Sequence, residues 1–218
     1  MRIKNLLFIL PTILIVLLAA CSSQSTEEQI HSHLEQAVGL EAEFENQQSA
    51  ITDLEVQEQE IYNQIIDLGM EDFQQITELS NEALSIIDQR EEKIELEKQS
   101  IESSQEEFTK IEDLIPNLED TEVKEKAEAM YGVMDNRYST YIALNKAYVN
   151  SLELEKELYT MLLQEEIEQE ELTEQINSIN ESYEQVLDLN EQFNNHTVEY
   201  NALKKEFYDA AELVVSYE

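Results

Sequence analysis

The clearest pattern in the chain is carried by residues 73–115, FQQITELSNEALSIIDQREEKIELEKQSIESSQEEFTKIEDLI. One line of residues recurs every seven positions and is almost entirely apolar: Phe73, Ser80, Ile87, Ile94, Ile101, Phe108 and Ile115. The partner line reads Ile76, Ala83, Arg90, Glu97, Ser104 and Ile111. Two such lines predict a helix with a coiled-coil-like seam. Because Arg90 and Glu97 interrupt the partner line, we expect this part of the seam either to lie near the edge of a bundle or to be mildly frustrated.

The residues before this helix also follow one helical face, from Thr26 to about Gly69. Thr26 and Gln29 have the spacing of a capping box, which predicts that the first helix begins there. Gly39 is the only interior breaker, and a glycine costs a helix about 1 kcal/mol relative to alanine. We therefore expect one uninterrupted helix over this range.

Two further helices are predicted after the heptad segment. Pro116 ends the second helix, because a proline disfavours helical geometry in the residue before it, and residues 116–120 form a turn. A third helix then begins near Thr121. The acid-rich run Gln164–Glu171 is interpreted as the next turn, because a helix continued to Leu213 would lack partners along much of its length.

These elements predict an all-α fold, an elongated antiparallel up-and-down four-helix bundle with coiled-coil-like packing. Each helix of roughly 40 residues would be about 60 Å long at 1.5 Å per residue. The alternative is a long two-helix hairpin about Pro116, with both arms continuous through Gly69 and through residues 164–171.

The N-terminus has the features of a lipoprotein signal. Residues 1–20 combine basic Arg2 and Lys4 with an apolar run, and Leu18-Ala19-Ala20-Cys21 resembles a lipobox. We expect cleavage between Ala20 and Cys21, a diacylglycerol on Cys21 with or without an added N-acyl chain, a tether over residues 21–25 and a bundle over 26–218. The alternatives are a cleaved signal with an incidental cysteine and an uncleaved anchor. The apolar run is shorter than the ~20 residues that a membrane-spanning helix needs.

Charge limits the partners of the mature chain. The formal net charge is −36, and removal of residues 1–20 takes away two basic residues and no acid, leaving 11 basic against 49 acidic residues. Nucleic acid is excluded as a partner, because binding it needs a cationic surface. Acyl chains rather than charge should hold the protein to the membrane.

The sequence offers little for catalysis or metal binding. The single cysteine is the expected lipid site, and neither a nucleophile elbow nor a glycine-rich phosphate loop is present. Glu28 and His31 have the Glu-x-x-His spacing of di-iron bundles, but neither His33 nor His196 repeats it. We therefore expect no enzyme activity, no metal and no cofactor other than the covalent lipid.

The third helix carries a stripe of tyrosines. Tyr138, Tyr141 and Tyr148 form a candidate glycan-binding or partner-binding face, because aromatic rings stack on sugars. The alternative is that these tyrosines lie at the core boundary, with buried rings and hydrated hydroxyls. The second interpretation is favoured.

Three stretches carry a resemblance to a known family: 68–73 (LGMEDF), 155–162 (EKELYTML) and 204–211 (KKEFYDAA). Together with the lipobox they resemble the YkyA-like family of Gram-positive lipoproteins, described as "putative cell-wall-binding" proteins. The resemblance implies a helical bundle on the outer face of the cytoplasmic membrane and no catalytic residues. We therefore expect an envelope interaction or scaffold module that meets an envelope protein or a wall polymer. The alternative is a glycan or small-ligand receptor that uses the tyrosine stripe.

Overall fold

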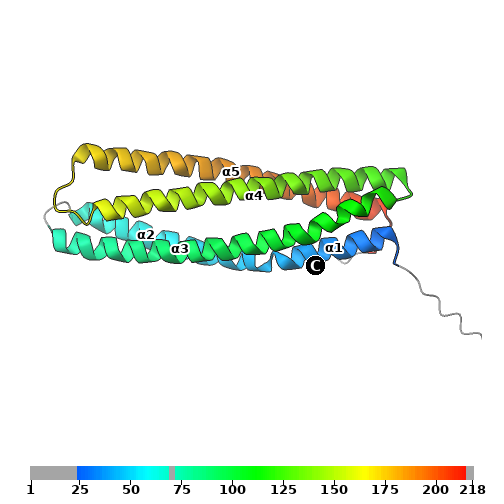
Figure 1. Ribbon diagram of the computed structural model, residues 1–218, viewed down its shortest axis with the longest axis horizontal. Coiled ribbons are helices and arrows are strands. Elements are labelled where there is room, and N and C mark those ends of the chain that lie inside the picture. Colours follow the sequence, from blue (N-terminus) through cyan, green and yellow to red (C-terminus); the bar gives the residue numbers. More distant parts are fainter. Residues whose placement is uncertain (1–23, 69–71, 215–218) are drawn as a thin grey trace, which may run out of the picture.

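The computed structural model describes residues 24–68 and 72–214. These residues form five α-helices and two short 3₁₀ segments, without strands (Figure 1). Their bounds are α1 Thr26–Leu40, α2 Ala42–Leu68, α3 Phe73–Phe108, η2 Thr109–Asp113, η3 Ile115–Asn117, α4 Thr121–Met161 and α5 Gln169–Ala210.

The helices form an elongated up-and-down bundle with four arms. The first arm consists of α1 and α2, which follow each other along the molecule and pack against α3. Next in order, α3 packs against α4, and α4 pairs along much of its length with α5. The predicted four-helix bundle is confirmed. The two-helix hairpin is wrong, because α4 ends at Met161 and residues 162–168 turn the chain back into α5.

The first arm is not the uninterrupted helix that the sequence predicted, because it is broken at Glu41. The Glu41 N–H bonds to the Val38 carbonyl at 3.0 Å, which tightens the end of α1. Ser100 of α3 bridges the break: its hydroxyl donates to the Leu40 carbonyl at 2.6 Å and accepts from the Phe44 N–H at 3.1 Å. Backbone groups that the break leaves unpaired are thus satisfied by a neighbouring helix.

Side chains cap the N-terminal ends of α1 and α4. The capping box at the start of α1 is formed by Ser25 and Glu28, so the predicted pair of Thr26 and Gln29 was wrong by one residue. At the other end of the seam, α3 continues as η2 and η3, and Pro116 lies inside η3. Asp120 caps α4 by accepting from the N–H groups of Glu122 and Val123.

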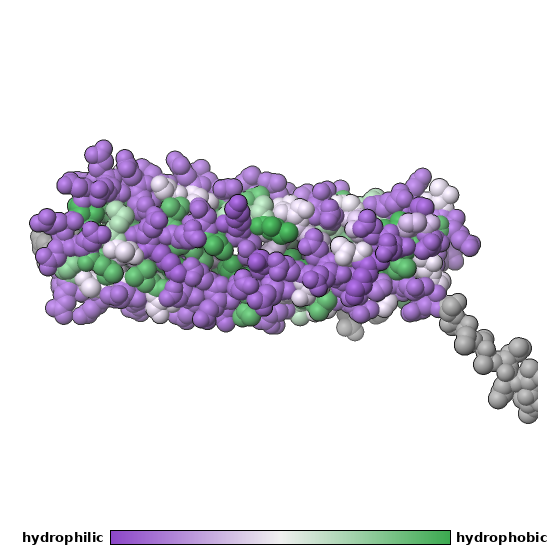
Figure 2. Space-filling model, in the orientation of Figure 1, coloured by the Kyte–Doolittle hydropathy of each residue, from purple (hydrophilic) through white to green (hydrophobic). Residues whose placement is uncertain are grey.

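The core consists of two apolar clusters along the bundle. One surrounds Phe108 and Tyr138 near the end where α1 begins, and the other surrounds Ile87 and Leu152 in the opposite half. Polar residues cover most of the visible surface, with hydrophobic side chains scattered among them (Figure 2). In the described ranges no helix is long and apolar enough to cross a membrane.

The helices are unequally buried. Within α5, which is described from end to end, no residue before Ser182 is buried. Between α2 and α5 there is no extensive contact, although both helices pack along the same bundle. One side of the bundle is therefore less closed than the other three.

Candidate functional site

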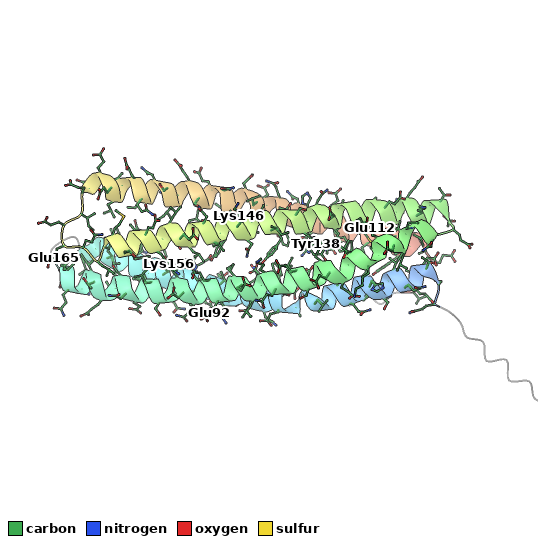
Figure 3. The ribbon with its side chains drawn as sticks, in the orientation of Figure 1. Glu92, Glu112, Tyr138, Lys146, Lys156 and Glu165 are labelled. Atoms are coloured by element: carbon green, nitrogen blue, oxygen red, sulfur yellow. The ribbon has the colours of Figure 1, made fainter. Side chains whose placement is uncertain are left out.

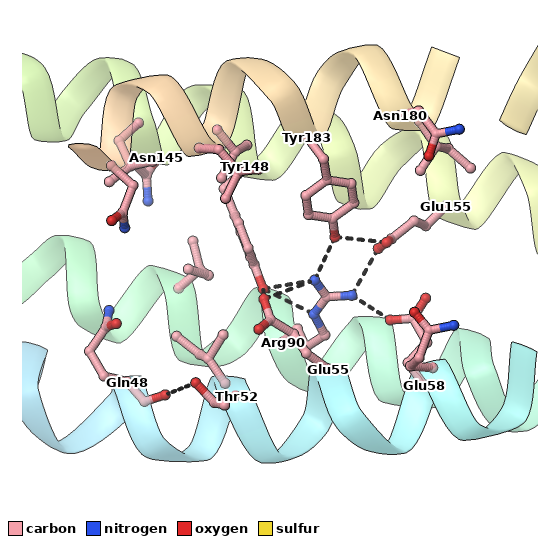
Figure 4. Close-up of a pocket in the computed structure, with 18 of the residues that line it drawn as sticks. Gln48, Thr52, Glu55, Glu58, Arg90, Asn145, Tyr148, Glu155, Asn180 and Tyr183 are labelled. Carbon is pink, nitrogen blue, oxygen red and sulfur yellow. Dashed lines mark hydrogen bonds and ion pairs between the residues drawn. The ribbon is translucent and has the colours of Figure 1, made fainter. Parts of the chain in front are cut away.

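A cavity of about 660 Å³ lies inside the bundle between α2, α3, α4 and α5 (Figure 4). Its floor is formed by buried residues of α3 and α4, including Arg90, Glu97, Tyr148 and Glu155. Its rim is formed by exposed residues of α2 and α5: Gln48, Thr52, Gln59, Asn180, Leu187 and Asn190. The cavity therefore opens on the side where α2 and α5 are not packed together.

Arg90 is the centre of the hydrogen-bond network on the cavity floor. Its Nη1 donates to Glu58 and, at 2.8 Å, to Glu155. Its Nη2 donates to the hydroxyls of Tyr148 and Tyr183, both at 2.8 Å, and its Nε donates to Tyr148 at 3.0 Å. The Tyr183 hydroxyl in turn donates to Glu155 at 2.7 Å. Four helices thus converge on one guanidinium (Figure 4).

A third carboxylate, Glu55, completes the network at the more exposed side. It accepts from the Tyr148 hydroxyl at 2.6 Å and lies 3.4 Å from Arg90 Nη2. An arginine has five N–H donors, and each N–H of Arg90 has an acceptor here. The Arg90 side chain is 1% exposed, and the hydrogen-bonding capacity of its guanidinium is fully used.

The carboxylates outnumber the arginine, which changes their pKa values. Burial and the nearby charge of Glu155 raise the pKa of Glu58 to about 7, and burial also raises the pKa of Glu155. Burial opposes the charge on Arg90, but the adjacent Glu155 raises the pKa of Arg90 above its ordinary value. Because one arginine faces two buried carboxylates, Glu58 loses its proton only near neutral pH and not near pH 4.5.

A fourth carboxylate of the cavity, Glu97, has no cationic partner among the described residues. Glu97 is 4% exposed and accepts from the Gln48 side-chain amide at 2.8 Å. No lysine, arginine or histidine of the described residues pairs with it, and burial raises its pKa to about 7. The nearby Tyr141 hydroxyl and Asn145 Nδ2 are buried without a hydrogen-bond partner in the described part of the chain. Glu97 and Asn145 nevertheless lie close enough to Tyr141 to affect its pKa, which burial raises.

Arg90 and Glu97 show that one of the two expectations for the heptad seam, a position at the edge of the bundle, is wrong. Both side chains are almost completely buried, so this part of α3 does not lie at the edge of the bundle. Instead, a polar layer crosses the interior, and the partners Glu58 and Glu155 come from α2 and α4. The sequence signal was a pair of charged residues at core positions of a heptad; nothing in the sequence identified their partners.

The predicted tyrosine face is not exposed. Tyr138 and Tyr141 are each 1% exposed and Tyr148 is 7% exposed, so none offers a surface ring for stacking. Tyr138 bonds to Ser104 of α3, as its position between α3 and α4 suggests (Figure 3). Its hydroxyl is therefore not the hydrated group expected at a core boundary. Tyr141 and Tyr148 line the internal cavity, whereas Tyr138 does not.

The other predicted sites fall into two groups. Ala20 and Cys21, the expected cleavage and lipidation sites, lie outside the described residues. Glu28 belongs to the capping box of α1, and the His31 ring packs against Tyr208 with centroids 5.1 Å apart. Within residues 24–68 and 72–214, no group of three or more histidine, cysteine, aspartate or glutamate residues could hold a metal ion.

The fold and this interior define a class: an elongated up-and-down helical bundle whose helices enclose a charged, tyrosine-rich cavity. Comparison with known proteins gives the family. The model of the YkyA family, described as "Putative cell-wall binding lipoprotein", matches residues 25–210, and the chain belongs to this family of lipoproteins. The resemblance found in the sequence is thereby confirmed.

A relative and a solved structure agree with this assignment. The chain is similar to "Uncharacterized lipoprotein YkyA" of Bacillus subtilis (strain 168), with 34% identity over 196 residues, 90% of this chain and 88% of that protein. The fold is similar to the crystal structure of a conserved protein of unknown function from Staphylococcus aureus, with a TM-score of 0.71. That match has 13% identity and covers 86% of this chain and 98% of the other, so it supports the fold alone.

Proposed function

We propose that this chain is a non-catalytic binding module of the cell envelope, held on the outer face of the cytoplasmic membrane by a lipid on Cys21. The observation that carries the proposal is the position of α1, which begins at one end of the bundle, five residues after Cys21. Five extended residues span at most about 18 Å. A lipid on Cys21 would therefore hold one end of the bundle at the membrane.

The bundle would then project away from the membrane. The longest helices, α4 and α5, have 41 and 42 residues, which is about 60 Å at 1.5 Å per residue. The family description supports a role in binding the wall. An envelope protein or a wall polymer is the partner that this placement favours.

The test of the anchor is the variant Cys21→Ala, expressed in a host that has the lipid-modifying enzymes. We expect the variant to leave the membrane fraction or to keep residues 1–20, measured by fractionation and by intact-protein mass. Ser22→Ala is the matched control, because it changes the neighbouring residue without removing the thiol. Equal membrane retention and equal processing of Cys21→Ala and the parent protein would refute the lipid anchor.

A further inference from the structure

The internal cavity has the size of a small-molecule site. Its volume of about 660 Å³ lies within the range of roughly 300–1,000 Å³ that is common for ligand pockets. Buried polar groups on α3 and α4 form its floor, and exposed residues of α2 and α5 form its rim. The proposed role of the bundle in the envelope makes no use of this cavity.

The charges of the cavity argue against an anionic ligand. Arg90 is the one arginine among the described residues that line it, and it already donates every N–H to groups of the protein. The carboxylates Glu55, Glu58, Glu97 and Glu155 line the same space. The carboxylates would repel a bound phosphate or carboxylate, and Arg90 has no N–H left to donate to it. The cavity therefore favours a cation or a neutral molecule.

The groups around Glu97 point to a cation. A buried carboxylate is normally paired with a positive charge, because burial of an isolated charge is costly. Glu97 accepts a short hydrogen bond from the amide of Gln48, at 2.8 Å, and no cation pairs with it among residues 24–68 and 72–214. Beside it, the buried Tyr141 hydroxyl and Asn145 Nδ2 make no hydrogen bond of normal length in the described ranges, although Tyr141 lies close to both Glu97 and Asn145. A ligand that satisfies all three groups needs a positive charge for Glu97 and an oxygen for Asn145 and Tyr141.

We propose that the cavity binds a small molecule with a protonated amine next to a hydroxyl or carbonyl oxygen. Glu97 is the counter-ion of the ammonium group. The amide of Asn145 and the hydroxyl of Tyr141 donate to the oxygen. The Arg90 network keeps the shape of the floor and does not contact the charge of the ligand.

Two kinds of molecule share this chemistry, and the experiment separates them. An amino sugar is represented by glucosamine and an aminoacyl ester by alanine methyl ester. N-acetylglucosamine and methyl lactate are their matched neutral analogues, because each keeps the neighbouring oxygen and lacks the positive charge. Binding is measured by calorimetry on the full chain in neutral detergent, so the result does not depend on where the protein is anchored.

We expect at least one charged probe to bind, and its neutral analogue to bind at least about tenfold more weakly, as loss of a charge-assisted hydrogen bond predicts. Glu97→Gln keeps the shape of the side chain and should weaken binding by about tenfold or more. Tyr141→Phe should weaken it by a smaller factor. Glu92→Gln on the exposed surface of the same helix and Tyr138→Phe outside the cavity are the controls, and both should bind like the parent chain.

Three results would overturn the proposal. The first is that neither charged probe binds at millimolar concentration. The second is that the neutral analogues bind as well as the charged probes, which would indicate a site for neutral polar molecules. The third is that Glu97→Gln binds like the parent chain while circular dichroism shows both folded, which would place the probes elsewhere.

Discussion

Arg90 occupies a position where the heptad pattern of α3 would otherwise place an apolar side chain. It is tolerated there because Glu58, Glu155 and two tyrosine hydroxyls accept its hydrogen bonds from three other helices. A buried charge of this kind is costly when a partner is removed, even where the intact network adds little to stability. The sequence marked Arg90 as unusual but could not identify its partners, because the relative register of α2, α4 and α5 is set by packing.

Replacing Arg90 tests this account. Arg90→Met should reduce the free energy of unfolding by about 3–5 kcal/mol, because it leaves Glu58 and Glu155 buried without a cation. The measurement is denaturant unfolding at neutral pH. Lys98→Met is the control, since the pair of Lys98 and Glu102 is largely exposed, at 37% and 50%, and should be worth less than about 1 kcal/mol. A loss below about 1 kcal/mol for Arg90→Met would contradict the network.

The buried carboxyl of Glu97 should make the free energy of unfolding depend on pH. Its pKa is about 7 in the folded chain, against an ordinary value of 4.5, because the carboxyl is buried. Because the pKa of Glu97 is higher in the folded chain than in the unfolded chain, protonated Glu97 contributes fully to stability below pH 4.5. This contribution is lost as the pH rises through 7. Glu97→Gln cannot ionise, so from pH 5 to pH 8 it should gain up to about 2.5 kcal/mol relative to the parent chain.

The measurement for Glu97 is chemical unfolding of both proteins at several pH values. Glu92→Gln should follow the parent chain throughout, because Glu92 is exposed on the same helix. A constant difference in stability between Glu97→Gln and the parent chain across this range would show that Glu97 does not titrate as described.

At the scale of the elements, the sequence predicted the helices better than their irregularities. The start of α4 at Thr121 and the turn before α5 were confirmed, because an aspartate cap and an acid-rich run mark them locally. The break at Glu41 was missed. It depends on Ser100, which lies 60 residues from Leu40 in the sequence and reaches its carbonyl only in the folded bundle.

Ser100→Ala tests the importance of the break. Removing the hydroxyl leaves the Leu40 carbonyl and the Phe44 N–H without their side-chain partner, which should cost about 1–2 kcal/mol. Ser103→Ala is the matched control, because the Ser103 hydroxyl is exposed and bonds only within its own helix, to Gln99. Equal unfolding free energies for the two variants would show that the bridge by Ser100 does not stabilise the break.

At the scale of the whole molecule, the seven-residue repeat and the turns were sufficient to predict an up-and-down bundle. The cavity was not predictable, because it arises where two helices of the bundle fail to pack closely. The tyrosines of α4 are an example of what the sequence could not predict. Their spacing placed them on one face, but which face points inward was decided by the packing of α3 and α5 around them.

The net charge of the molecule predicts how it meets wall polymers. Without residues 1–20 the chain carries 11 basic and 49 acidic residues, so anionic wall polymers should repel it at low salt. The Debye length is about 30 Å at 0.01 M salt and about 8 Å at 0.15 M. We expect co-sedimentation with purified sacculi to increase with salt or with calcium or magnesium. Tight binding in low salt without divalent ions would instead reveal a cationic attachment site.

The first part of α5 should open locally more easily than the rest of the bundle, because its side chains are not buried. Residues 169–181 contribute no buried side chain, whereas Phe193, Tyr200 and Phe207 anchor the rest of the helix. Segments with few buried contacts open with a smaller free energy than the whole fold. In deuterium exchange, the backbone amides of residues 173–181 should therefore exchange well before those of 193–208. Equal protection along α5 would show that this helix opens only when the entire bundle unfolds.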